Sequence, residues 1–175
     1  VLGCIILAIV LYSTGTANQK QLRTITELNA MTYAERMTSD LNDGITITDA
    51  LKEILVSENG KIANFSLIAE DMMTSAIQSI QLAPDGVVTQ IYPATGNEAG
   101  KIDLLHDKGR SELSLYAKEH NTVVMQGPFE LRQGNVCIAI RNPVFLEDGT
   151  GAQQFWGFAI VIIRVPDILS GSVQA

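Results

Sequence analysis

The chain has 175 residues and a mass of 18.9 kDa, the size of one domain with a hydrophobic core of its own. Hydrophobic residues make up 46% of the sequence and charged residues 18%, which excludes an intrinsically disordered protein. A net charge of -7 and an isoelectric point of about 4.7 exclude the basic surface that nucleic-acid binding requires.

The first segment, residues 1–11, is apolar and uncharged throughout. It is too short to cross a bilayer, which takes about 20 residues. We therefore expect residues 1–17 to be the C-terminal part of a transmembrane helix with its juxtamembrane segment, with Tyr12 at the interface. A signal-peptide core or a buried helix is the alternative.

Residues 18–60 are predicted to be an N-terminal helical region. A long helix over residues 18–41 carries apolar side chains at steps of three or four: Leu22, Ile25, Leu28, Met31, Ala34, Met37 and Leu41. Asp43 and Gly44 predict its end. Thr48 and Asp49 then predict a short capped helix that stops at Asn59 and Gly60. A further helix is expected over residues 62–79.

From Ile80 onward the pattern changes to short strands separated by turns. Strands are expected at residues 80–82, 87–92, 122–125, 136–140 and 155–165, with a helix over residues 107–120. Helices first and strands joined by hairpin turns afterwards indicate an α+β domain with an antiparallel sheet of about five strands.

Chemistry-bearing motifs are sparse. Cys4 and Cys137 are expected to be small buried apolar residues, and His106 and His120 to be exposed. Their spacing gives no zinc or iron–sulfur signature, so we expect no metal and no cofactor. No nucleophile elbow, phosphate-binding loop or paired-carboxylate pattern is present, so we predict no catalytic residues and no enzyme in this region.

Four segments in the second half resemble a CHASE domain, the extracellular sensory module of membrane-bound histidine kinases and nucleotide cyclases. They are LAPDGVV at 82–88 with IYP at 91–93 and GNE at 96–98, QGPFEL at 126–131 with QG at 133–134, RNPVF at 141–145, and FWGF at 155–158. Their order and spacing both fit. The resemblance implies a long N-terminal helix, a PAS-like sheet and a ligand pocket on one face of that sheet.

Within this family, the plant cytokinin receptors allow the pocket to be compared residue by residue. Their pocket positions correspond to Arg110, Gln126, Arg132 and Arg141 of this chain. The plant receptors have an aspartate in place of Arg110 and a threonine in place of Arg141. The resemblance therefore implies a ligand other than a cytokinin.

The three arginines suggest what that ligand is. A guanidinium presents a planar fork that binds carboxylate or phosphate through two hydrogen bonds. Arg141 is the strongest candidate, because an arginine at the end of an apolar strand needs a reason to be there. The alternative is that each arginine is solvated or paired with a nearby acidic residue.

Three other side chains are weaker candidates for the pocket. Gln126 offers an amide, Tyr92 a hydroxyl and Trp156 a stacking surface. Core packing is the alternative for Tyr92 and Trp156.

The sequence thus predicts four parts: the membrane end at 1–17, the helical region at 18–60, a PAS-like sensory domain at 61–170 and an exit at 171–175 toward a second membrane helix. The expected function is extracytoplasmic sensing of a small molecule by a homodimeric receptor in the cell membrane, with an anion as the hypothesis for the ligand. A protein-interaction or dimerisation module without a small-molecule ligand is the alternative, and an exported hydrolase is a distant third.

Overall fold

The computed structural model describes residues 2–94, 99–100, 102–131 and 134–166, with side chains from residue 19 onward. It divides into two compact units, Val1–Ser39 and Asp40–Ala175. The elements are α1 (Leu2–Ser57), α2 (Phe65–Asp71), β1 (Ile77–Pro84), β2 (Gln90–Tyr92), α3 (Ser111–His120), β3 (Val124–Glu130), β4 (Val136–Glu147) and β5 (Gln153–Arg164). The predicted α+β class is confirmed.

The first unit is helical in its described part. Its apolar side chains Leu22, Ile25, Leu28 and Met31 are exposed by 47–61%. Because a helix turns through 100° per residue, steps of three residues make this row wind around the helix instead of following one side.

The predicted end of the first helix at Gly44 is wrong, and so is the separate short helix after it. Gly44 is buried within α1, where a Cβ atom would lie 2.6 Å from Cδ1 of Ile140. The glycine therefore permits close packing of helix on sheet and does not terminate the helix. The second predicted signal is confirmed, since α1 ends just before Asn59 and Gly60, both with positive φ.

The five strands form one antiparallel sheet in the order β2-β1-β5-β4-β3. The helix predicted over residues 62–79 is wrong for most of its length. Only Phe65–Asp71 is helical there, and β1 begins at Ile77. The apolar residues after Asp71 match helical spacing, but buried Ile77 and Ile80 belong to a strand.

Strand β4 continues through Pro143, where the sequence predicted its end. Its neighbour β3 pairs with β4 only as far as Arg141, opposite Val124. From Asn142 onward, β4 pairs with β5 and no longer with β3. Proline has no backbone N–H to donate, and no residue of β3 lies opposite Pro143 to need one.

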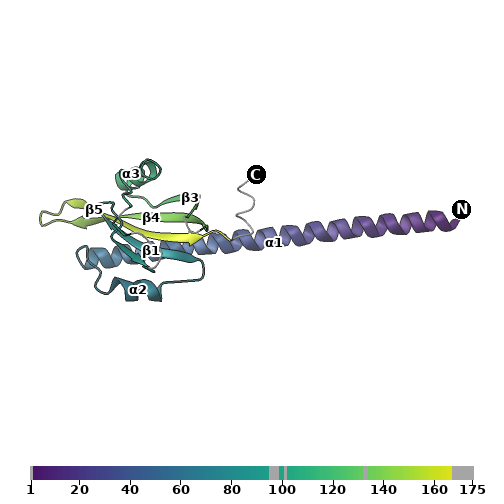
Figure 1. The fold of residues 1–175 in the computed structure, drawn as a ribbon, viewed down its shortest axis with the longest axis horizontal. Helices are drawn as coiled ribbons and strands as arrows, with labels where there is room; N and C mark the ends of the chain where they lie inside the picture. Colours follow the sequence, from purple (N-terminus) through teal and green to yellow (C-terminus); the bar gives the residue numbers. More distant parts are fainter. Residues whose placement is uncertain (1, 95–98, 101, 132–133, 167–175) are drawn as a thin grey trace. The chain divides into compact units, whose positions relative to one another are not determined.

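The two faces of the sheet carry separate parts of the core, with α3 on one side and α1 and α2 on the other (Figure 1). The α3 side contains Cys137, Ala139, Phe158, Ile160 and Ile162. The other face includes Ile140 and Ile163, which lie against Gly44 of α1. Cys137 is buried and free, as predicted, whereas the side chain of Cys4 lies outside the described residues.

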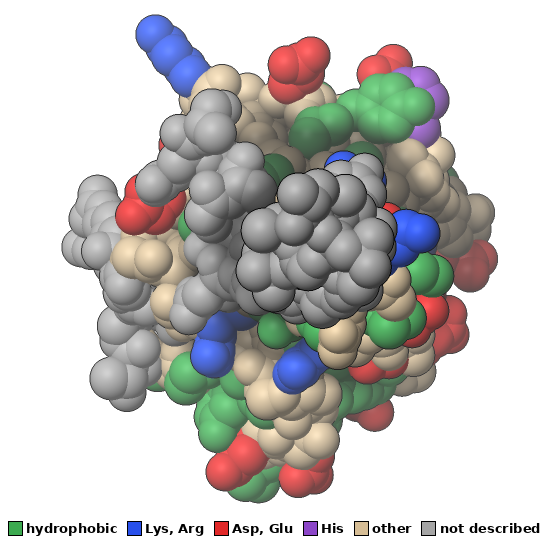
Figure 2. Space-filling model, turned by 90° about the vertical axis from the view of Figure 1, so that its right-hand side faces the viewer, with side chains coloured by type: hydrophobic (Ala, Val, Ile, Leu, Met, Phe, Trp, Pro, Cys, Tyr) green, Lys and Arg blue, Asp and Glu red, His purple; other side chains and the backbone are tan. Residues whose placement is uncertain are grey.

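Acidic side chains are spread around the rim of the face drawn in Figure 2. Among the described residues, no helix combines the length and apolar character needed to span a bilayer. The predicted exit at 171–175 lies outside the described residues.

Candidate functional site

The site is centred on Arg141, which lies within β4 directly opposite Ile160 of β5. Only 3% of the residue is exposed. Its Nη2 donates a hydrogen bond of 2.6 Å to Oε1 of Gln126. Its Nε and Nη1 are buried and have no partner among the described residues. Buried donors without partners are costly, so this guanidinium has unused capacity to bind an acceptor.

Among the described residues, Gln126 is the side chain that pairs with the Arg141 guanidinium. Its amide oxygen accepts from Arg141, and its Nε2 donates to the carbonyl oxygen of Gly109 at 2.6 Å. The β3 backbone bends immediately after this residue, because Gly127 has a φ of 145° and the pairing with β4 shifts there. A Cβ atom on Gly127 would lie 2.8 Å from the carbonyl oxygen of Cys137, which accounts for the glycine.

Arg110 brings a second cation to the same place. It precedes α3 as its N-cap residue and is half-exposed, and its Nη1 lies 2.9 Å from Oδ2 of Asp107. Burial and, to a smaller extent, the neighbouring charge of Arg110 lower the pKa of Arg141 to about 10, while Asp107 opposes the change. The guanidinium still carries its charge at neutral pH. Two arginines therefore converge beneath an acidic protein surface.

The arginines lie between an inner cavity and an outer cleft. The inner cavity has a volume of about 90 Å³ over the sheet, and its walls include Ser79, Gln81, Ala139, Ile160 and Ile162. The outer cleft has a volume of about 500 Å³ and is lined by Gln126, Gly127 and Pro128 among others. Arg110, Phe129 and Arg141 line both spaces. The two arginines therefore contribute positive charge to both spaces.

The structure brings together Arg110, Gln126 and Arg141 of the predicted site residues. Tyr92 is opposite Ile80 and so faces the other side of the sheet. Partial burial and the neighbouring carboxylate of Glu70 raise its pKa. Trp156 lies against Gly60, also away from the cavity. Arg132 lies outside the described residues.

Sequence analysis missed Ser79 and Gln81. Both are buried, and Nε2 of Gln81 donates a 2.9 Å hydrogen bond to Oγ of Ser79. The signal was present, because two polar residues two positions apart in a strand share one face. Read alone, that alternation indicates a solvent-facing surface.

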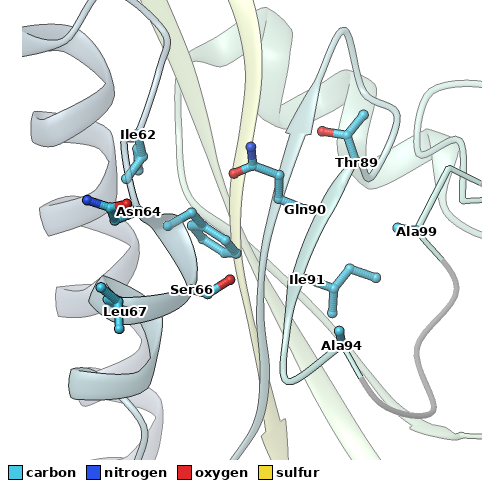
Figure 3. Close-up of a pocket in the computed structure, with 10 residues that line it drawn as sticks. Ile62, Asn64, Ser66, Leu67, Thr89, Gln90, Ile91, Ala94 and Ala99 are labelled. Carbon is cyan, nitrogen blue, oxygen red and sulfur yellow. The ribbon is translucent and has the colours of Figure 1, made fainter.

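A second, open pocket lies between α2 and the edge strand β2 (Figure 3). It has a volume of about 580 Å³. Ile62, Ser66 and Leu67 lie on one wall, and Thr89 and Gln90 on the other. Its described lining includes no charged side chain, so it offers shape and weak polar contacts but no strong electrostatic attraction.

The family is decided by a sequence match that covers residues 13–175. The chain belongs to the CHASE domain family. Because this family consists of extracellular sensory modules, the chain is a sensory domain and not a catalytic one. No curated protein matches it.

Among solved structures, this CHASE domain is similar to an extracellular ligand binding receptor from Desulfohalobium retbaense DSM5692. The TM-score is 0.57 and the sequence identity 17%, and the match covers 82% of this chain. It covers 25% of the receptor's chain, so the CHASE domain spans about a quarter of that protein's length. At this identity the likeness concerns the fold alone.

Proposed function

We propose that this CHASE domain is the small-molecule-binding part of a receptor and that its ligand is an anion held by Arg141. One observation carries the proposal: Arg141 is only 3% exposed, and its Nε and Nη1 have no hydrogen-bond partner among the described residues. A stable protein that leaves a charge in this state bears a cost of about 1–3 kcal/mol for each unpaired donor. An anionic ligand removes that cost by accepting from both nitrogens.

Arg110 supports the same proposal. Its guanidinium lines the same cavity, and like charges in proximity favour an anion between them. Its pairing with Asp107 leaves it half-exposed, in a position to reorient when an anion enters. The solved receptor of the same fold is itself described as ligand binding, which agrees with a binding role.

Signal relay is the second part of the proposal. Arg141 faces the cavity, while the next residue of β4, Asn142, faces the opposite side and donates a 2.6 Å hydrogen bond to Oδ1 of Asp49 in α1. A ligand that shifts β4 therefore acts on the N-terminal helix through two adjacent residues. A ligand acts only by binding two states with different affinity. Residues 1–17 would carry the change into the membrane, toward a kinase or cyclase domain outside this sequence.

The alternative is a protein-interaction module without a small-molecule ligand. That function favours arginines that face solvent on a well-packed domain. The burial of Arg141 beside a cavity argues against it.

Isothermal titration calorimetry of the chain with acetate, propanoate, phosphate and sulfate tests the anion site. We expect saturable binding of at least one anion by the native protein and no detectable binding by Arg141→Met. Arg36→Met, which removes an exposed arginine from the first unit, is the matched control and should bind normally. Equal binding by both variants, or no binding of any anion to the native protein, contradicts the proposal.

The pH dependence follows from the pKa of Arg141. The charged form predominates below its pKa of about 10, so anion binding should persist at neutral pH and be lost as the pH rises through about 10. For a carboxylate ligand, binding should also be lost below about pH 4, where the ligand becomes neutral. Titrations at pH 5, 7, 9 and 11 measure the upper limit.

A further inference from the structure

The register of the sheet gives the inner cavity two chemically different ends. Ile160 of β5 pairs with Arg141 on one side and with Gln81 on the other. Arg141, Ile160 and Gln81 therefore form one row across three strands, with their side chains on one face. Ile162 pairs in the same way with Ala139 and Ser79, which gives a second row beside the first.

The two rows define a charged end, an apolar middle and a neutral polar end. Strands lie about 4.8 Å apart, so the backbones that carry Arg141 and Gln81 are about 10 Å apart. Both residues line the same cavity over the sheet. A ligand held between them has its anionic group at Arg141 and a hydrogen-bonding group at Gln81.

The volume limits the size of that ligand. The cavity of about 90 Å³ is smaller than the cavity of about 150 Å³ known to admit benzene. A carboxylate of two or three carbons with one further polar atom has five or six non-hydrogen atoms, about the most that this space accepts.

The neutral end selects the second polar group. The bond to Ser79 uses one N–H of the Gln81 amide, whose oxygen and second N–H are suited to bind a group that both donates and accepts. A hydroxyl does both. An ammonium group would add a cation beside Arg110 and Arg141, and no acidic side chain stands among the described residues that line the cavity.

We infer that the ligand of this cavity is a short hydroxycarboxylate of two or three carbons, with its carboxylate on Arg141 and its hydroxyl on Gln81. This inference rests on the proposed anion site and adds the size and the second polar group of the ligand. Gln81 acts as the residue that selects the hydroxylated acid.

Calorimetry with four probes of nearly equal size tests the inference: propanoate, 2-hydroxypropanoate, 3-hydroxypropanoate and alanine. At least one hydroxy acid should bind about tenfold more tightly than propanoate, which corresponds to one hydrogen bond to a buried group. Gln81→Leu should remove this preference, so that the hydroxy acids bind no more tightly than propanoate, and circular dichroism shows whether the variant is folded. Gln90→Leu, in the separate pocket of Figure 3, should retain the preference.

The outcomes separate the two proposals. Equal affinities for propanoate and both hydroxy acids overturn this inference and leave the anion site intact. Tightest binding of alanine overturns the choice of a hydroxyl group. Absence of binding by all four probes, together with no response to any inorganic anion, overturns the anion site itself.

Discussion

At Arg141, the proposed role in ligand binding conflicts with the stability of the native state. Without a ligand, its buried charge and two unpartnered donors destabilise the native state. A methionine at this position fills a similar volume and needs no hydrogen bonds. Under the proposed function, the arginine serves ligand binding and not stability.

Arg141→Met should raise the free energy of unfolding of the ligand-free domain by about 1–3 kcal/mol, because it removes the cost of buried donors without partners. Urea denaturation followed by circular dichroism measures the change. Gln126 loses one partner in this variant, but its amide lines the open outer cleft and is accessible to water there. A loss of stability of more than 1 kcal/mol would instead assign the guanidinium a structural role.

A turn residue carries a separate pH effect. Hydrogen bonds from the hydroxyl and amide of Thr150, and then from Ala152 and Gln154, lower the pKa of Asp148 to about 2. A carboxylate with a lowered native pKa stabilises the fold above its unfolded pKa of about 3.9, and this contribution is lost as the pH falls toward 2. Unfolding free energies should therefore fall less between pH 5 and pH 2 in Asp148→Ala than in the native protein. An identical fall in both would contradict the lowered pKa.

At the scale of elements, β4 links the cavity to α1. Asn142 is 2% exposed and bonds to Asp49, with Oγ of Thr48 at 3.4 Å. Since Arg141 and Asn142 are adjacent, a displacement of the strand by a ligand reaches the helix without an intermediate element.

Asn142→Leu should lower the free energy of unfolding by about 1.5–3 kcal/mol, the size of a lost hydrogen bond to a charged group. It should also uncouple the two faces. In hydrogen exchange, an anion should increase protection of amides in residues 40–57 of the native protein and have little effect there in Asn142→Leu. Asp49→Asn, which keeps an acceptor for the bond, is the control. If the anion increases the protection of amides in residues 40–57 equally in the native protein and in both variants, this route of coupling is excluded.

The sequence predicted the class, the five strands and the convergence of Arg110, Gln126 and Arg141, because turn residues and family segments are local signals. It did not predict that α1 continues through Gly44, since the reason lies in Ile140, far along the chain. It also did not show that Tyr92 and Trp156 face away from Arg141. Their orientation depends on strand register and on the irregular pairing near Val144, which no local pattern encodes.

At the scale of the whole molecule, the exposed apolar residues of the first unit bear on whether the chain forms a dimer. Its exposed apolar residues are costly to leave in water and suit a second copy of the chain. We therefore retain the homodimer as a proposal.

Sedimentation velocity tests it. Ile25→Glu combined with Leu28→Glu should convert a dimer to a monomer, because both changes put charge into the apolar row. Thr26→Glu combined with Ala30→Glu adds the same charge on the side of the helix away from Ile25 and Leu28 and should leave the dimer intact. A native protein that sediments as a monomer at all concentrations would contradict the proposal.

The central claim is that the Arg141 guanidinium binds a small anion, and arginine side-chain NMR tests it most directly. In a ¹⁵N-labelled chain, the Nε–H signal absent from Arg141→Met belongs to Arg141. Titration with hydroxypropanoate should shift this signal saturably and leave that of Arg36 in place. If the Arg141 signal stays unchanged at millimolar concentrations of every carboxylate and inorganic anion tried, the cavity is not an anion site and the proposed ligand-binding role of Arg141 is wrong.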